Sequence, residues 1–165
     1  MCSSDLKLPT GVYRLRDREG TINEPTIQPG SGSTDGIVSV LYSHQVIPNQ
    51  GEWFISASRK VNGENDLDYR FGDDSQANAG WRYKTAHDLT WSIQVNGRRT
   101  LRDTFRGMSV PSTGSTIVHL TPGLRLEGKS GTSIYGFVQV PVYEQVNEAN
   151  LAPRVGLILG LSHPF

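Results

Sequence analysis

Apolar and polar side chains alternate along seven stretches of this chain. In the clearest stretch, residues 89–99, the odd positions are mainly apolar and the even positions are polar. Successive side chains of a β-strand point to opposite faces, so each stretch is expected to form a strand with one apolar and one polar face. The pattern predicts strands at 35–45, 52–61, 74–84, 89–99, 115–126, 133–144 and 153–163, and residues Leu6 to Leu8 as the tail of an earlier strand.

Two prolines fall inside these predicted strands. Pro122 and Pro141 have no backbone N–H and therefore cannot donate a hydrogen bond to a neighbouring strand. We expect each of them to mark a bulge or a strand end.

The connections between the predicted strands alternate between long and short. The long ones are 9–34, 62–73 and 100–114, the short ones are 46–51, 85–88 and 127–132, and 145–152 is of middling length. Transmembrane barrels have short periplasmic turns and longer extracellular loops. The chain is therefore predicted to be all-β, an antiparallel transmembrane (meander) β-barrel with about seven or eight strands present, and an incomplete barrel.

The last predicted strand fits the same interpretation. Its apolar residues alternate with Gly156, Gly160 and Ser162, and the chain stops at the aromatic residue Phe165. A closing strand of a bacterial outer-membrane barrel faces lipid on one side and a polar lumen on the other. The predicted partners are outer-membrane lipids and the barrel assembly machinery that recognises such a C-terminal strand.

Tyr and Trp residues gather near the short connections. By the parity of their positions, the Trp residues and Tyr83 lie on the apolar face, close to the predicted periplasmic rim. Interfacial aromatic residues form belts at the lipid headgroups, whereas aromatic residues also pack at the end of a soluble β-sandwich. The predicted membrane-interface aromatic residues are Tyr42, Trp53, Trp81, Tyr83, Trp91 and Phe165.

The opposite parity defines a polar face that would line the lumen. The predicted lumen-lining residues are Gln76, Asn78, Arg82, Ser92, Gln94, Asn96, Arg98, His119 and Arg125. Basic residues exceed acidic ones on this face, which is compatible with an anion preference. The same excess is also compatible with cations at strand ends that simply reach water, or with balancing carboxylates on strands outside this sequence.

Composition and motifs exclude several other functions. Sixteen basic residues balance sixteen acidic ones, so no basic excess points to nucleic acid. The single Cys2 forms no internal disulfide, no Cys/His spacing suggests zinc, and no known catalytic motif occurs. The acidic stretch 62–68 is interpreted as a solvated surface loop, because it lacks calcium-loop spacing. We expect no enzyme activity, no catalytic residues, no metal and no cofactor.

The first residues have no signal-peptide pattern. Residues 1–6 resemble a translated sequencing-adapter tail behind a start residue, although an ordinary polar N-terminus is the alternative. We expect 1–6 to be non-native and 7–165 to be the C-terminal part of a single outer-membrane β-barrel domain.

Three segments and the closing strand carry a family resemblance. Residues 7–11 (KLPTG), 28–35 (QPGSGSTD) and 135–147 (YGFVQVPVYEQVN), followed by a Gly- and Leu-rich strand, resemble the meta-pathway phenol-degradation family of proteobacterial outer-membrane barrel transporters. The resemblance implies location in the bacterial outer membrane and passage of small hydrophobic or aromatic compounds. It transfers no catalytic residues.

Taken together, these features predict an outer-membrane channel or transporter that passes small solutes by passive diffusion. Two alternatives stay open. One is a soluble β-barrel or sandwich that binds a ligand, with its apolar face turned inward. The other is a structural outer-membrane barrel without transport.

Overall fold

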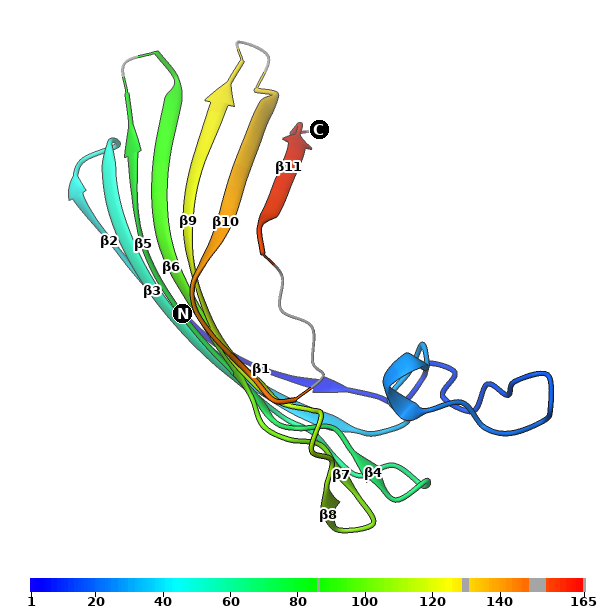
Figure 1. Cartoon of the computed structure of the whole chain (residues 1–165). Coiled ribbons are helices and arrows are strands. Elements are labelled where there is room, and N and C mark those ends of the chain that lie inside the picture. The colour runs from blue at the N-terminus through cyan, green and yellow to red at the C-terminus, as the bar shows by residue number, and fades with distance from the viewer. Residues whose placement is uncertain (86, 129–130, 149–153, 165) are drawn as a thin grey trace.

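The computed structural model describes residues 1–85, 87–128, 131–148 and 154–164. It consists mainly of one open, curved antiparallel sheet of eight strands in the order β1-β2-β3-β5-β6-β9-β10-β11 (Figure 1). Each strand pairs with its neighbours in this chain order, which makes the sheet a meander. The strands are β1 (Cys2–Lys7), β2 (Asp35–Ile47), β3 (Gly51–Val61), β5 (Asp74–Lys84), β6 (Leu89–Thr100), β9 (Ser115–Glu127), β10 (Ser133–Val146) and β11 (Gly156–Ser162).

The connections separate the sheet into two ends. Short connections join β2 to β3, β5 to β6 and β9 to β10 at one end, which we call the turn end. The long connections gather at the opposite, loop end. They contain the 3₁₀-helix η1 (Pro25–Ile27) and a small sheet of β4 (Tyr69–Arg70), β7 (Thr104–Phe105) and β8 (Met108–Ser109). No helix in the described part of the chain is both long and apolar enough to cross a membrane.

The period-two pattern located the main strands well. The predicted all-β, antiparallel meander is confirmed, and the strand ends lie within three residues of the prediction. The predicted start at 153 lies outside the described residues, and β11 begins at Gly156. The expected strand tail at Leu6 belongs to β1, most of which consists of residues expected to be non-native. The small sheet of the loop end was not predicted.

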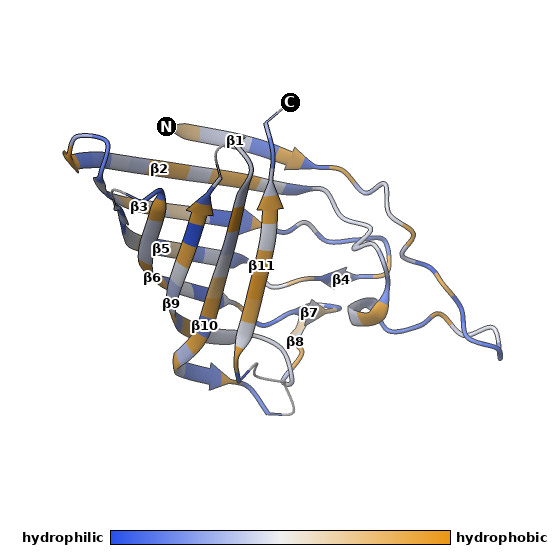
Figure 2. Cartoon of the chain, turned by 90° about the horizontal axis from the view of Figure 1, so that it is seen from above, coloured by the Kyte–Doolittle hydropathy of each residue, from blue (hydrophilic) through white to orange (hydrophobic). Residues whose placement is uncertain are grey.

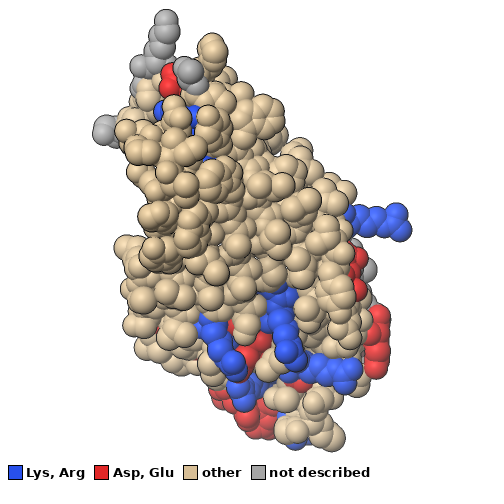
Figure 3. Space-filling model, turned by 90° about the vertical axis from the view of Figure 1, so that its left-hand side faces the viewer, with Lys and Arg blue, Asp and Glu red and all other residues tan. Residues whose placement is uncertain are grey.

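The two faces of the sheet differ in polarity. Across β3, β5, β6 and β9, Ile55, Ala79, Val95 and Leu120 lie side by side on one face, and their polar neighbours lie on the other. Figure 2 shows the resulting alternation of apolar and polar residues along the strands. The apolar side chains occupy the convex face, where most charged residues lie toward one end of the molecule (Figure 3). The polar side chains occupy the concave face.

A closed apolar interior is not formed by the described residues. Tyr69, in the loop-end sheet, is their only buried hydrophobic residue, and many large apolar side chains of the convex face are exposed. The chain exposes 11279 Å² of surface, against about 8,000 Å² expected for a compact monomer of this length. The sheet is also open, with β1 and β11 as its edges. Barrel closure is not observed, and membrane insertion stays a prediction.

The two prolines behave differently. The pairing of β9 with β10 shifts between Pro141 and Tyr143, so the predicted bulge at Pro141 is confirmed. Pro122 lies within β9, directly opposite Ile93 of β6, and the β9–β10 pairing keeps one register on either side of it. The expectation of a bulge or strand end at Pro122 is therefore wrong. The β9–β10 pairs skip Pro122 and resume beyond it, so the missing N–H is accommodated without an extra residue.

Three glycines of the concave face are each covered by an aromatic ring from a neighbouring strand. Phe54 lies over Gly80, Phe137 over Gly123 and Tyr135 over Gly160. A Cβ atom at Gly123 would come within 2.2 Å of the Phe137 ring and 2.7 Å of the Ser92 hydroxyl. These sites therefore require glycine because of close side-chain packing.

We predict that Gly123→Ala destabilises the folded sheet by about 1–3 kcal/mol, because the added methyl group displaces the Phe137 ring. Gly97→Ala is the matched control, since a Cβ there would meet only the Ala77 carbonyl oxygen, at 3.6 Å. The temperature at which the refolded chain in detergent loses its folded gel mobility measures the effect. Equal shifts for the two variants would contradict the packing argument.

Candidate functional site: the concave face

All nine residues predicted to line a lumen lie on the concave face. Strand pairing sets Gln76 opposite Arg98, Asn78 opposite Asn96 and Arg82 opposite Ser92. The remaining three continue the same rows of side chains: Gln94, His119 and Arg125. The structure thus brings the predicted set together on one surface.

The middle of the concave face is an uncharged hydrogen-bonded row. The Asn78 amide donates to the Ser56 hydroxyl (3.1 Å), and the Asn96 amide donates to Asn78 Oδ1 (3.0 Å). The Thr121 hydroxyl then donates to Asn96 Oδ1 (2.6 Å). These contacts join four neighbouring strands through their side chains, so the polar groups of this row are satisfied within the sheet.

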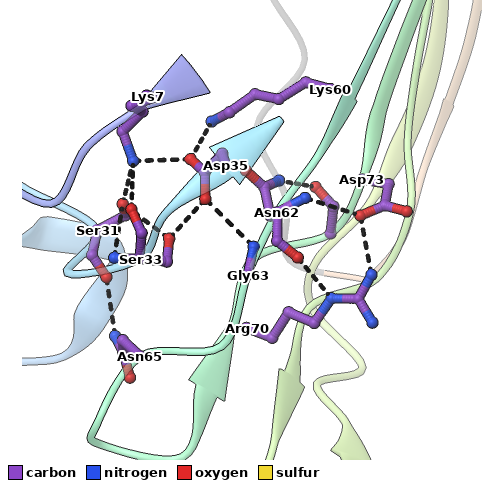
Figure 4. Close-up of polar contacts among 11 residues, drawn as sticks. Lys7, Ser31, Ser33, Asp35, Lys60, Asn62, Gly63, Asn65, Arg70 and Asp73 are labelled. Atoms are coloured by element: carbon purple, nitrogen blue, oxygen red, sulfur yellow. Dashed lines mark hydrogen bonds and ion pairs between the residues drawn. The ribbon is translucent and has the colours of Figure 1, made fainter. Parts of the chain in front are cut away.

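The loop end of the concave face is centred on Asp35, which is fully buried (Figure 4). Its carboxylate lies 2.7 Å from Lys7 Nζ and 3.0 Å from Lys60 Nζ. It also accepts hydrogen bonds from the Ser33 hydroxyl (2.7 Å) and the Gly63 N–H (3.2 Å). Two cations and two neutral donors compensate the burial of this carboxylate. Asp35 thereby ties β1 and β3 to the start of β2.

Asp74 has a similar role in β5, beyond β3. Its carboxylate accepts hydrogen bonds from the Arg98 guanidinium (2.6 Å), the Thr100 hydroxyl (2.9 Å) and the Gln76 amide (2.9 Å). Lys60 lies directly opposite Asp74 in the β3–β5 pairing. Acidic and basic side chains therefore alternate from β1 to β6 across the loop end.

The turn end is charged in the same alternating way. Arg82 pairs with Glu52 at 2.9 Å, and Lys84 pairs with Glu127 at 2.5 Å. Arg125 also lies 3.5 Å from Glu127. The described cations of the polar face that have acidic partners within this chain are Lys60, Arg82, Lys84, Arg98 and Arg125. Carboxylates from strands outside this sequence are therefore not needed to pair these residues. Asp35, Asp74 and Glu127 were overlooked, although they share the parity of the polar face.

An aromatic hollow lies on the concave face next to the turn-end charges. It has a volume of about 540 Å³, and its walls include Phe54, Tyr135 and Phe137. The Arg82 guanidinium stacks over the Phe54 ring at 5.3 Å, and the Tyr135 and Phe137 rings are 5.9 Å apart. The sequence pattern did not single out these residues. Alternation within one strand shows which face a side chain is on, but not that two distant strands bring aromatic rings together.

The predicted interfacial aromatic residues form a band on the convex face at the turn end. Trp53 lies opposite Trp81, and Tyr83 lies opposite Trp91. The Tyr42 and Trp53 rings are 5.3 Å apart. Phe165 lies outside the described residues. The band spans β2, β3, β5 and β6 beside the short connections.

The acidic stretch in the 62–73 connection is more ordered than the expected solvated loop. Asn62, Asn65 and Asp73 are buried. The Arg70 guanidinium donates hydrogen bonds to the Asn62 carbonyl oxygen and to the Asp73 carboxylate. The Tyr69 hydroxyl donates to Asp103 at 2.5 Å. Burial, and then this hydrogen bond to a carboxylate, raise the pKa of Tyr69. Asp66 and Asp68 are exposed, so the prediction is correct only for that portion of the stretch.

No group of three or more His, Cys, Asp and Glu side chains within the described residues is arranged to hold a metal ion.

No family model matches this chain, and no curated protein or solved structure is significantly similar to it. The family resemblance therefore rests on the quoted segments alone.

We predict that Asp35→Asn destabilises the folded chain by about 2–4 kcal/mol, because Lys7 and Lys60 lose their shared carboxylate. Asp66→Asn is the control, since Asp66 is half-exposed and its ion pair is with the exposed Arg14; exposed pairs contribute about 0–1 kcal/mol. Urea unfolding of the refolded protein measures both. Similar losses for the two variants would refute the central role of Asp35.

The raised pKa of Tyr69 predicts a pH-dependent contribution. The folded state favours the neutral phenol, so its stabilisation is complete below the ordinary Tyr pKa of about 10 and falls as the pH rises above it. The stability difference between the native protein and Tyr69→Phe should therefore be constant from pH 7 to pH 9 and shrink above pH 10. Subtraction removes the contributions of the other titrating groups. A difference that does not change up to pH 11 would contradict the prediction.

Proposed function

We propose that this chain forms the wall of a bacterial outer-membrane β-barrel and that small solutes diffuse passively along its concave face. On this proposal the convex face contacts lipid, the turn end faces the periplasm and the loop end faces outward. The family resemblance adds small hydrophobic or aromatic compounds as candidate solutes. The alternating last strand, with its aromatic C-terminal residue, adds recognition by the barrel assembly machinery.

The observation that carries the proposal is the exposure of large apolar side chains on the convex face. Trp91 and Ile93 of β6 are 52% and 50% exposed, and Leu157 and Leu159 of β11 are 67% and 73% exposed. In water, a continuous apolar surface of this size requires a covering partner. In a bilayer it is matched by lipid, while the concave face keeps its polar groups in water.

The direction of curvature favours this proposal over a soluble ligand-binding barrel. In a soluble barrel the apolar face turns inward around a core or ligand. Here the sheet bends away from its apolar face and encloses its polar one. The aromatic band at the turn end is also where a headgroup belt is expected.

The position of the three Trp residues provides a direct test. Trp53, Trp81 and Trp91 all lie on the convex face, and the chain has no other Trp. We predict that brominated lipids quench most of the Trp fluorescence of the chain reconstituted in vesicles, whereas aqueous iodide quenches little. Folding in buffer without detergent, with no quenching by brominated lipid, would favour the soluble alternative.

Ion conductance distinguishes transport from a purely structural barrel. The reconstituted full-length protein, with every strand needed to close the barrel, should give discrete conductance steps in planar bilayers. Lipid quenching without conductance or solute uptake would leave the membrane assignment intact and refute the transport role.

A further inference from the structure

The aromatic hollow has a floor of small and polar residues between two walls of aromatic rings. Strand pairing sets Gly80 opposite Gln94, and Ser92 opposite Gly123, so these residues form a continuous floor over β5, β6 and β9. Phe54 projects over Gly80 from β3, and Phe137 projects over Gly123 from β10. Because the two glycines have no side chains, the bottom of the hollow lies at the backbone there. The Phe54 and Phe137 rings cover the two glycines from opposite sides of the hollow.

The spacing of the strands sets the width of this hollow. β3 and β10 are four strand spacings apart, which is about 19 Å along the sheet. Each ring lies over one neighbouring strand, which places the centres of the two rings about two spacings, roughly 10 Å, apart across the sheet. This width accepts a single six-membered ring with its substituents.

The floor also offers hydrogen-bonding groups that the protein does not use. The Ser92 hydroxyl and the Gln94 amide have no side-chain partner among the described residues, in contrast to the satisfied row of Asn78, Asn96 and Thr121. A bare aromatic solute would leave both groups unpaired, which weakens binding by roughly tenfold for each group. A hydroxyl-bearing ring satisfies them.

The charges around the hollow are already balanced. Arg82 is paired with Glu52, Arg125 and Lys84 share Glu127, and Lys84 also lies 3.4 Å from Asp88, so three carboxylates face three cations. A charged ligand would have to compete with these pairs, whereas a neutral ligand leaves them in place. The hollow is thus matched to a ligand that combines a flat apolar side, hydroxyl groups and no net charge.

We infer that this aromatic hollow is a binding subsite for a neutral cyclic polyol, such as a monosaccharide in its pyranose form. The Phe54 and Phe137 rings contact the C–H faces of the sugar, and Ser92 and Gln94 bind its hydroxyl groups. The inference rests on the proposed function, because it places this sugar on the path of passive diffusion. It deepens the proposal of passive diffusion by naming a solute class, a neutral polyol, that differs from the hydrophobic or aromatic compounds the family resemblance implies.

The experiment measures block of the ion current of the reconstituted full chain by D-glucose, with glycerol at equal viscosity and phenol as comparison solutes. We expect saturable block by glucose with half-saturation in the roughly millimolar range typical of so small a ligand. Phe54→Leu and Phe137→Leu keep much of the side-chain volume but remove the rings, and each should raise the half-saturating concentration at least fivefold. Phe105→Leu, in the small loop-end sheet, is the matched control and should change it less than twofold.

A further variant separates sugar binding from binding of aromatic compounds. Gln94→Leu removes a hydrogen-bonding group from the floor and should weaken glucose block about tenfold. The subsite is overturned if glucose reduces the current no more than glycerol does. It is also overturned if Phe54→Leu and Phe137→Leu both leave the half-saturating glucose concentration unchanged. The subsite is also overturned if phenol blocks the current saturably at a lower half-saturating concentration than glucose, and if Gln94→Leu lowers that phenol concentration further.

The two proposals fail in different ways. Absence of any conductance refutes transport. Saturation-transfer NMR of glucose with the folded chain in detergent then tests the subsite independently. Loss of the transfer signal in Phe54→Leu and Phe137→Leu supports it, and absence of a signal with the native chain overturns it.

Discussion

A single layer of strands must divide its side chains between two surroundings, and this division is the constraint on which the rest of the structure depends. There is no second sheet or helix layer to bury the apolar side of β2 to β11 among the described residues. The central strands β3, β5, β6 and β9 therefore keep most of their apolar residues on the convex face and most of their polar residues on the concave face. Backbone hydrogen bonds between adjacent strands hold the layer together, and the side chains decide what each face contacts.

The concave face is arranged so that its polar groups largely neutralise one another. Charged pairs occupy both ends, and an uncharged amide and hydroxyl row separates them. This arrangement follows from register, because side chains of opposite charge on adjacent strands reach each other only when the strands are correctly aligned. The result is a polar surface with little net charge and a locally aromatic region, rather than a face on which basic residues exceed acidic ones.

The sequence predicted what depends on local alternation and missed what depends on distant neighbours. Period-two patterning located seven strands and assigned the nine polar-face residues to one surface, because parity is a property of each strand alone. The partners of Asp35 come from β1 and β3, so no local pattern reveals that this carboxylate is buried between two lysines. The small loop-end sheet has two-residue strands, which are too short to show a period. Phe54 and Phe137 are far apart in the chain, and strand order alone brings them to the walls of one hollow.

The irregularity after Pro141 changes how the end of β10 is oriented. The pairing of β10 with β9 resumes one residue later, so Tyr143 lies opposite Val118 and Glu144 lies opposite Ile117. Uninterrupted alternation would give the opposite assignment and turn the carboxylate of Glu144 outward. One additional residue thus places Tyr143 on the convex face and Glu144 on the concave face near the end of the strand. A single-residue insertion in such a wall is consequently tolerable where a bulge absorbs it, and related chains of unequal strand length can keep the same two-sided architecture.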